Sequence, residues 1–91
     1  MPDAPPFDLF FSAQAQEDIE HWRRIDKRVS QRIERLLADI SAHPFTGIGK
    51  PEPLRYQLAG YWSRRITGEH RLVYKVAGNT VFVAQCRFHY Q

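Results

Sequence analysis

Hydrophobic residues recur along this chain with two different periods, and the change of period divides the sequence into a helical part and a strand part. Before Pro44 the apolar side chains are spaced by three and four residues, which is typical of one face of an α-helix. From Leu54 onward apolar and polar residues alternate, which is typical of strands with one buried face. The succession of the two parts predicts an α+β domain.

The helical part predicts two helices in direct succession. Ser12 is a natural N-cap for the first helix, whose apolar positions are Ala15, Ile19 and Trp22. Asp26 is the corresponding cap for the second helix, which ends before the proline. The apolar positions of the second helix are Val29, Ile33, Leu36, Leu37 and Ile40. Because almost no linker separates the two helices, we expect an αα-hairpin.

The alternating part predicts four strands, at residues 54–58, 61–67, 71–77 and 80–89. The short apolar run at residues 7–11 predicts one more. The expected fold class is therefore α+β, with an N-terminal strand and a two-helix hairpin packed on one face of a mostly antiparallel four- to five-stranded sheet.

The alternation also assigns side chains to the two faces of this sheet. In the last strand it predicts a helix-facing set made of Phe82, Ala84, Cys86 and Phe88. Arg64 shares a face with Trp62 and interrupts the apolar pattern, so we expect it at an edge or a bulge. The opposite, polar face is expected to bring together Arg65, Arg71, Arg87 and His89.

Length and composition limit the classes of function. The 91 residues are expected to form one domain, with residues 1–6 as a flexible tail. The formal net charge of +3 permits an anionic partner. We find no signal peptide and no apolar run of the ~20 residues that a membrane span needs, so we expect no membrane partner. The single cysteine, Cys86, is expected to be a small buried hydrophobe in a cytoplasmic protein.

Two apparent motifs do not meet the requirements of the sites they suggest. Gly47-Ile48-Gly49-Lys50 lacks the preceding glycine and the following Ser or Thr of a phosphate-binding P-loop. Cys86 and His89 have the spacing of half a zinc site, but the sequence has no second pair. We therefore predict neither a metal nor a cofactor.

Four residues suggest chemistry on a phosphate ester. Glu52 lies between two prolines, which stiffen the backbone on both sides of it. With Arg65, Arg71 and His89 it could supply the base, the cations and the acid for attack by a ribose 2′-hydroxyl on the adjacent phosphate of RNA. These residue types are also common on any surface, and Glu52 would equally suit a salt-bridged turn.

A second group of arginines leaves two interpretations open. Arg28, Arg32 and Arg35 share one face of the second predicted helix. They form either a solvated face, partly neutralised by Glu34 and Asp39, or a contact with nucleic acid.

Several ordered segments resemble the YoeB/Txe family of bacterial toxins, over about residues 11–90. They are Pro44-Phe45, Gly47, Gly49 to Leu54, Gly60 to Ile66, Glu69 to Tyr74, and Cys86 to Tyr90, together with the Trp22 and Asp26-Lys27-Arg28 region. The resemblance implies a RelE-like fold. It also implies a metal-independent endoribonuclease, an mRNA interferase that cuts mRNA in the A site of the 70S ribosome and so inhibits translation.

The resemblance also implies roles for individual residues and partners. Glu52 would be the general base and His89 the general acid, while Arg65 and Arg71 stabilise charge. The RNA-contact set would be Lys50, Arg55, Arg87 and Tyr90. The partners would be mRNA, ribosomal RNA, a YefM/Phd-type antitoxin and a second copy of the chain in a homodimer.

Two features depart from the family pattern. Arg55 occupies a position where lysine is common, which keeps the charge but changes its geometry. The chain also has a Pro-rich N-terminal extension and one residue, Gln91, after Tyr90. Two other functions remain open: a ParE-like toxin that poisons DNA gyrase, and an RNA-binding module without catalytic activity.

Overall fold

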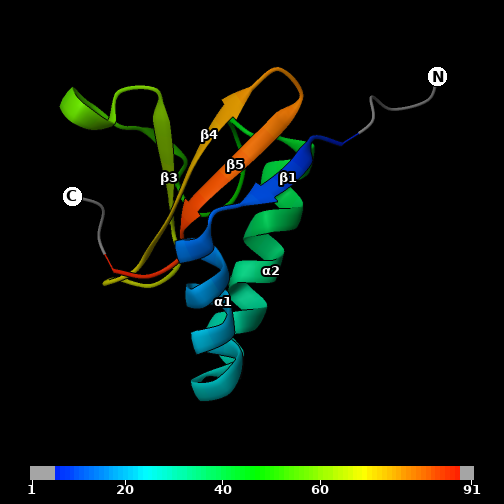
Figure 1. Cartoon of the computed structure of the whole chain (residues 1–91), viewed down its shortest axis with the longest axis vertical. Helices are drawn as coiled ribbons and strands as arrows, with labels where there is room; N and C mark the ends of the chain where they lie inside the picture. The colour runs from blue at the N-terminus through cyan, green and yellow to red at the C-terminus, as the bar shows by residue number, and fades with distance from the viewer. Residues whose placement is uncertain (1–5, 89–91) are drawn as a thin grey trace.

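The computed structural model describes residues 6–88, so residues 1–5 of the tail expected at 1–6 lie outside the described residues, as do His89 and Tyr90. Two helices pack against one face of a five-stranded sheet (Figure 1). In chain order the elements are β1 (Asp8–Phe11), α1 (Ala13–Ile25), α2 (Lys27–Ala42), β2 (Glu52–Pro53), a 3₁₀ turn (Tyr56–Leu58), β3 (Tyr61–Arg65), β4 (Arg71–Ala77) and β5 (Thr80–Gln85). This arrangement confirms the expected α+β class.

Both helices begin at the predicted caps. The Ser12 hydroxyl accepts a hydrogen bond from the Ala15 N–H at 3.0 Å. The Asp26 carboxylate accepts from the N–H groups of Arg28 and Val29, at 3.0 and 3.2 Å. These bonds satisfy N–H groups that have no partner within the helix. The two helices of residues 6–88 have 13 and 16 residues, and neither has the length and hydropathy that crossing a membrane requires.

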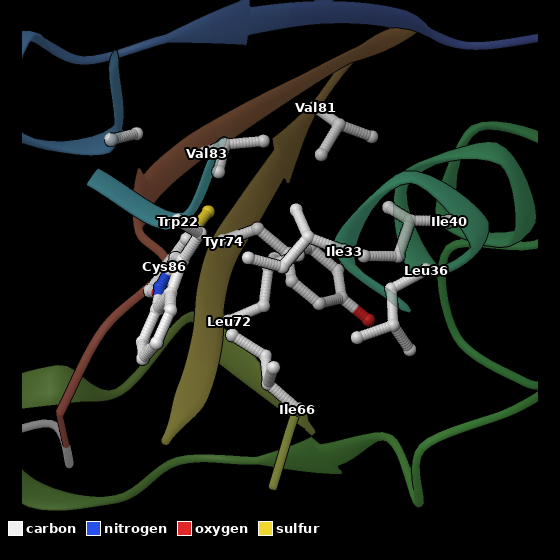
Figure 2. Packing of buried hydrophobic residues seen from close by; sticks show 11 residues of the cluster. Trp22, Ile33, Leu36, Ile40, Ile66, Leu72, Tyr74, Val81, Val83 and Cys86 are labelled. Carbon is white, nitrogen blue, oxygen red and sulfur yellow. The ribbon is translucent and has the colours of Figure 1, made fainter. Parts of the chain in front are cut away.

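The strand order is β1-β5-β4-β3-β2. The pairs β2–β3, β3–β4 and β4–β5 are antiparallel, while β1 runs parallel to β5. The sheet is thus mixed and mostly antiparallel, as expected. Its helix-facing side and the apolar faces of α1 and α2 enclose the core, in which Trp22, Ile33, Leu36, Leu72, Tyr74 and Val83 lie close together (Figure 2).

The strand predicted at residues 54–58 is wrong. Pairing with β3 occurs earlier, at Glu52–Pro53, and the chain then enters the 3₁₀ turn. Tyr56 has a left-handed backbone (φ 58°) that cannot continue a strand, and its side chain is 87% exposed. The apparent alternation of Leu54, Tyr56 and Leu58 therefore does not reflect a buried face. The next predicted strand, 61–67, ends at Arg65.

The helix-facing set predicted for β5 is wrong at Phe82, and also at Phe88, which is 57% exposed and lies beyond the end of the strand. Val81 and Val83 are fully buried toward the helices, while Phe82 pairs with Lys75 on the other side of the sheet. Between Tyr74 and Val73 of β4 the register of β5 advances by two residues, so that Ala84 is the extra residue of a β-bulge. The bulge reverses the alternation, and Cys86 therefore lies in the core as predicted. The strand ends at Gln85 rather than at residue 89.

Arg64 lies neither at an edge nor at a bulge. It is in β3, between β4 and β2, with no exposed surface and with regular pairing to Leu72. Its guanidinium group reaches across the end of α2 to the loop at residues 43–48. There it donates to Asp39 and to the carbonyl oxygens of His43, Thr46 and Ile48, and its Nε donates to the Tyr74 hydroxyl. These five bonds allow an inward-facing charge that the alternation alone makes unexpected.

Candidate functional site

The candidate site lies on the sheet face that points away from the helices. Strand register places Glu52 opposite Ser63, Ser63 opposite Val73, and Val73 opposite Gln85. Directly paired residues project from the same face, with Cβ atoms about 4.5–5.5 Å apart. Glu52 therefore stands at one end of a row of side chains that crosses four strands.

A second row contains the two predicted arginines. Arg65 is two residues beyond Ser63 in β3, on the same face, and it pairs directly with Arg71 of β4. Two residues along a strand cover about 7 Å, and the diagonal neighbour across a strand pair lies about 7–8 Å away. Glu52 thus lies on the same face as Arg65 and Arg71, and the predicted outward orientation of the two arginines is confirmed.

Several hydrogen-bond donors on this face are buried and have no partner. Within residues 6–88 these are Nε and one Nη of Arg71 and the Ser63 hydroxyl. Arg87, whose Nε is also buried without a partner among these residues, lies beside α1, where it lines a hollow with Asp18, His21 and Arg24, and not with Arg65 and Arg71 as predicted. A buried donor without an acceptor costs about 1–3 kcal/mol, and more when the group is charged. Donors of this kind, directed from neighbouring strands onto one face, suit a phosphate or another oxyanion.

Glu52 is exposed and lines a hollow of about 510 Å³ with Pro53, Leu54, Arg55 and Tyr56. The predicted RNA contact Arg55 therefore lies beside Glu52. The predicted contact Lys50 lies next to Gly49, whose carbonyl oxygen accepts the Arg65 N–H at 2.7 Å. This backbone hydrogen bond joins the loop that carries Lys50 to β3 at Arg65.

The loop that carries Lys50 toward Glu52 is held by Arg64 and Asp39. Asp39 also accepts from the Ile48 N–H at 3.0 Å. Burial would raise the pKa of Asp39, but the hydrogen bonds from Arg64 and Ile48 and the charge of Arg64 outweigh it, and the pKa is lowered. Gly47 (φ 126°) lies so close that an added Cβ would overlap the Asp39 carboxylate. Arg64 is therefore a structural residue that positions the loop.

Cys86 is not available for chemistry. It has no exposed surface, and burial, with a smaller contribution from the charge of Asp18, raises the pKa of its thiol to about 12. A thiol in this state is not a nucleophile at neutral pH. The predicted structural role of Cys86 in the core is confirmed.

The arginines of α2 are not neutralised by the two nearby acids. Among the described residues the salt bridges are Arg23–Glu20 and Arg64–Asp39. Asp39 is thus engaged by Arg64, and Glu34 lines a groove between α1 and α2. Arg32 donates a hydrogen bond to the backbone carbonyl oxygen of Arg65 at 3.3 Å, which connects this basic helix face with the arginine row.

An aromatic row beside the site was not predicted from the sequence. Tyr61, Lys75 and Phe82 are paired in register on the same outer face, and the Lys75 ammonium lies 5.5 Å from the centre of the Tyr61 ring and 5.9 Å from that of Phe82. Phe10, which is 60% exposed, packs on Phe82 with ring centres 5.6 Å apart. Phe82 was predicted to face the helices because simple alternation along the last strand takes no account of the bulge at Ala84.

The chain as a whole corresponds to one known family. Residues 11–90 match the family described as YoeB-like toxin of bacterial type II toxin-antitoxin system. The chain belongs to this family. Toxin YoeB of Streptomyces coelicolor is 51% identical over 82 residues, which cover 90% of this chain and 98% of that relative. Toxin YoeB of Escherichia coli is 48% identical with the same coverage, and the resemblance seen in the sequence is confirmed.

Solved structures of YoeB toxins share the fold over almost the whole chain. The YoeB/ParE toxin from Agrobacterium tumefaciens has a TM-score of 0.88 at 48% identity, covering 91% of this chain and 99% of that one. YoeB in the YoeB-YefM complex from Staphylococcus aureus has a TM-score of 0.84 at 44% identity, covering 92% and 98%. This chain is therefore a YoeB toxin of a toxin-antitoxin system, and the proposals below start from that membership.

Proposed function

We propose that this protein is a ribosome-dependent mRNA endoribonuclease that inhibits translation by cutting mRNA in the ribosomal A site. The attacking group is the 2′-hydroxyl of the message itself, and the bond that breaks joins phosphorus to the 5′-oxygen of the next nucleotide. The protein then needs a base, cations for the charge that develops on the phosphate, and an acid for the leaving oxygen. No metal ion is part of this mechanism.

Each described residue of the proposed catalytic set has a position that suits its role. Glu52 takes the proton of the 2′-hydroxyl from the exposed end of its row. Arg65 and Arg71 bind the phosphate oxygens and stabilise the additional negative charge of the transition state. His89 protonates the leaving 5′-oxygen, and the RNA-contact set is Lys50, Arg55, Arg87 and Tyr90; His89 and Tyr90 lie outside the described residues.

The observation that carries the proposal is the buried, unpaired guanidinium nitrogens of Arg71 on the same sheet face as Glu52. A poison of DNA gyrase or a plain RNA-binding module needs no carboxylate beside a phosphate site. A general acid–base nuclease needs both. Membership in the YoeB-like toxins supports the same conclusion from an independent direction.

We further propose a YefM/Phd-type antitoxin as the neutralising partner and a homodimer as the free form. YoeB from Staphylococcus aureus has been solved as a dimer and in a YoeB-YefM complex. The basic outer face of this chain suits an acidic antitoxin segment that covers the site. If charges at the rim of the contact steer the two proteins together, their association rate falls as salt is added.

Primer extension on translated mRNA tests the proposed activity. We expect cuts at defined codons on ribosome-bound message and far slower cutting of the same naked message, because a domain of 91 residues relies on the ribosome to orient the RNA. Glu52→Gln should bind ribosomes and leave the message uncut. DNA damage with intact mRNA would point instead to a gyrase poison, and ribosome binding without cuts by the wild type to a non-catalytic module.

The role of His89 has its own test. His89→Gln should bind ribosomes normally and cut slowly. A substrate with sulfur in place of the leaving 5′-oxygen departs without a proton, so it should restore much of the lost rate. If His89→Gln cuts both substrates equally slowly, the assignment of His89 as the general acid is contradicted.

A further inference from the structure

The chain leaves β5 through a short segment, Cys86–Phe88, whose backbone is held by other elements at both ends. The Cys86 N–H donates to the buried Asp18 carboxylate at 2.9 Å, and the Trp22 indole N–H donates to the Cys86 carbonyl oxygen at 2.8 Å. At the other end, the Phe88 N–H donates to Nδ1 of His70 at 2.8 Å. The Phe88 carbonyl oxygen accepts the N–H of Arg71 at 3.0 Å.

His70 connects three parts of the molecule at this point. It ends the turn between β3 and β4, where its N–H donates to the Thr67 hydroxyl and its carbonyl oxygen accepts from the Ile66 N–H. Its ring lies edge-on to Trp22 with centres 4.8 Å apart, and 5.8 Å from the ring of Phe88. The imidazole is therefore oriented by α1, by the turn and by the exiting chain together.

The backbone of Phe88 needs this support. Its φ is 62°, a left-handed conformation that is unfavourable for a bulky residue. Such strain persists only where the surroundings impose it. The bonds to His70 and Arg71 lie on either side of the strained residue. Without the His70 acceptor, the Phe88 N–H loses its partner and Phe88 can relax to an extended backbone.

The hydrogen bond also defines what His70 does. Because Nδ1 accepts the Phe88 N–H, the proton of the neutral ring is on Nε2. His70 is not one of the outward-facing residues of the arginine row, but it directly precedes Arg71, and the residue after Phe88 is the proposed acid His89. We propose that His70 is a positioning residue: by accepting the Phe88 N–H it fixes, next to Arg71, the backbone from which the proposed acid His89 follows. This inference rests on the proposed nuclease function.

Three variants separate positioning from a general structural role. His70→Ala removes the acceptor. His70→Asn is the conservative variant, because the amide oxygen of asparagine can occupy nearly the place of Nδ1 and accept the same N–H. His43→Ala is the matched control, since His43 is an exposed histidine at the end of α2 with no role in the site.

The hydrogen bond from the Phe88 N–H to His70 can be tested without any substrate. We expect the Phe88 amide to be protected from hydrogen exchange in the wild type, in His70→Asn and in His43→Ala, and at least about tenfold less protected in His70→Ala. The Val81 and Val83 amides in β5 report on the whole fold and should exchange alike in all four proteins. An unprotected Phe88 amide in the wild type, or unchanged protection in His70→Ala, would overturn the inference.

Single-turnover cleavage on ribosomes then tests the consequence. We expect His70→Ala to cut about 10- to 100-fold more slowly, as is typical when a group that orients a reacting residue is lost, while its affinity for ribosomes stays the same. His70→Asn should recover most of the rate, and His43→Ala should match the wild type. If His70→Asn cuts as slowly as His70→Ala, positioning through the acceptor is refuted.

A double variant shows whether His70 acts through His89. In a background that already carries His89→Gln, adding His70→Ala should reduce the rate by less than about twofold, because residues that act as one unit are not additive. The same loss in both backgrounds would overturn the inference while leaving the nuclease function intact. A wild type that cuts no message would instead refute the proposed function itself.

Discussion

Arg64 and Arg71 lie on adjacent strands of one sheet, yet their guanidinium groups have opposite environments. Arg64 faces the helices, is completely buried and donates five hydrogen bonds. Arg71 faces away from the helices, and two of its buried nitrogens have no partner among the described residues. The comparison teaches that burial does not determine the role of an arginine. A fully paired guanidinium holds the fold together, and an unpaired one is available to bind an anion.

Removing the paired arginine should have the largest effect. Arg64→Met leaves Asp39 and three loop carbonyl oxygens without their donor, and breaking a buried ion pair in this way costs about 3–5 kcal/mol of unfolding free energy. The measurement is chemical unfolding of the purified toxin. Arg65→Met, the exposed neighbour in the same strand, should change the free energy by less than about 0.5 kcal/mol. Equal effects of the two changes would refute the structural role of Arg64.

Removing the unpaired arginine should affect the rate instead. Arg71→Ala deletes donors that stabilise the transition state, and the loss of one such donor typically lowers the rate ~10²–10³-fold. Its thermal unfolding should stay close to that of the wild type, because two of the deleted nitrogens are buried without a hydrogen-bond partner in the described part of the chain. Arg65→Ala should behave similarly. An unfolded Arg71→Ala protein would show that this arginine is structural as well, and would remove the contrast with Arg64.

The contribution of the Arg64–Asp39 ion pair to the stability of the fold should also depend on pH. The pKa of Asp39 is lowered in the folded protein from its ordinary 3.8, so the contribution of Asp39 is fully present above that value and is lost as the pH falls through the lower folded pKa. Asp39→Asn should therefore be less stable than the wild type near neutral pH, and the difference should shrink below about pH 4. Urea unfolding of both proteins between pH 6 and pH 3 measures it. A difference that does not vary with pH would contradict the lowered pKa.

The smallest expected effect concerns the arginines of α2, which have no acidic partner among the described residues but lie outside the arginine row. If they contact RNA phosphates, Arg28→Gln and Arg35→Gln should each reduce the slope of log affinity against log salt by about 1. Arg23→Gln removes the same charge from an arginine already paired with Glu20 and should leave the slope unchanged. Ribosome binding by the inactive Glu52→Gln protein provides the measurement. Unchanged slopes for both α2 variants would indicate a solvated face.

Local sequence determined the elements whose physical cause is local. The caps at Ser12 and Asp26 and the helical spacing up to Ile40 needed only neighbouring residues, and the structure confirms them. The same holds for the outward orientation of Arg65 and Arg71, because alternation along regular strands needs no knowledge of the partner strand. Family membership could also be predicted from the sequence, because the motifs of the family occur in order along almost the whole chain.

Other features were decided only when distant segments came together. A bulge at Ala84 reversed the faces of β5, and a turn at Tyr56 replaced a strand, because each depends on pairing across strands. The burial of Arg64 depends on Asp39 and the loop at residues 43–48, which lie within reach of its guanidinium group. His70 shows the same principle, since its acceptor meets the Phe88 N–H across 18 residues. Alternation predicts which way a side chain points, but only the folded chain determines whether a hydrogen-bond partner lies there.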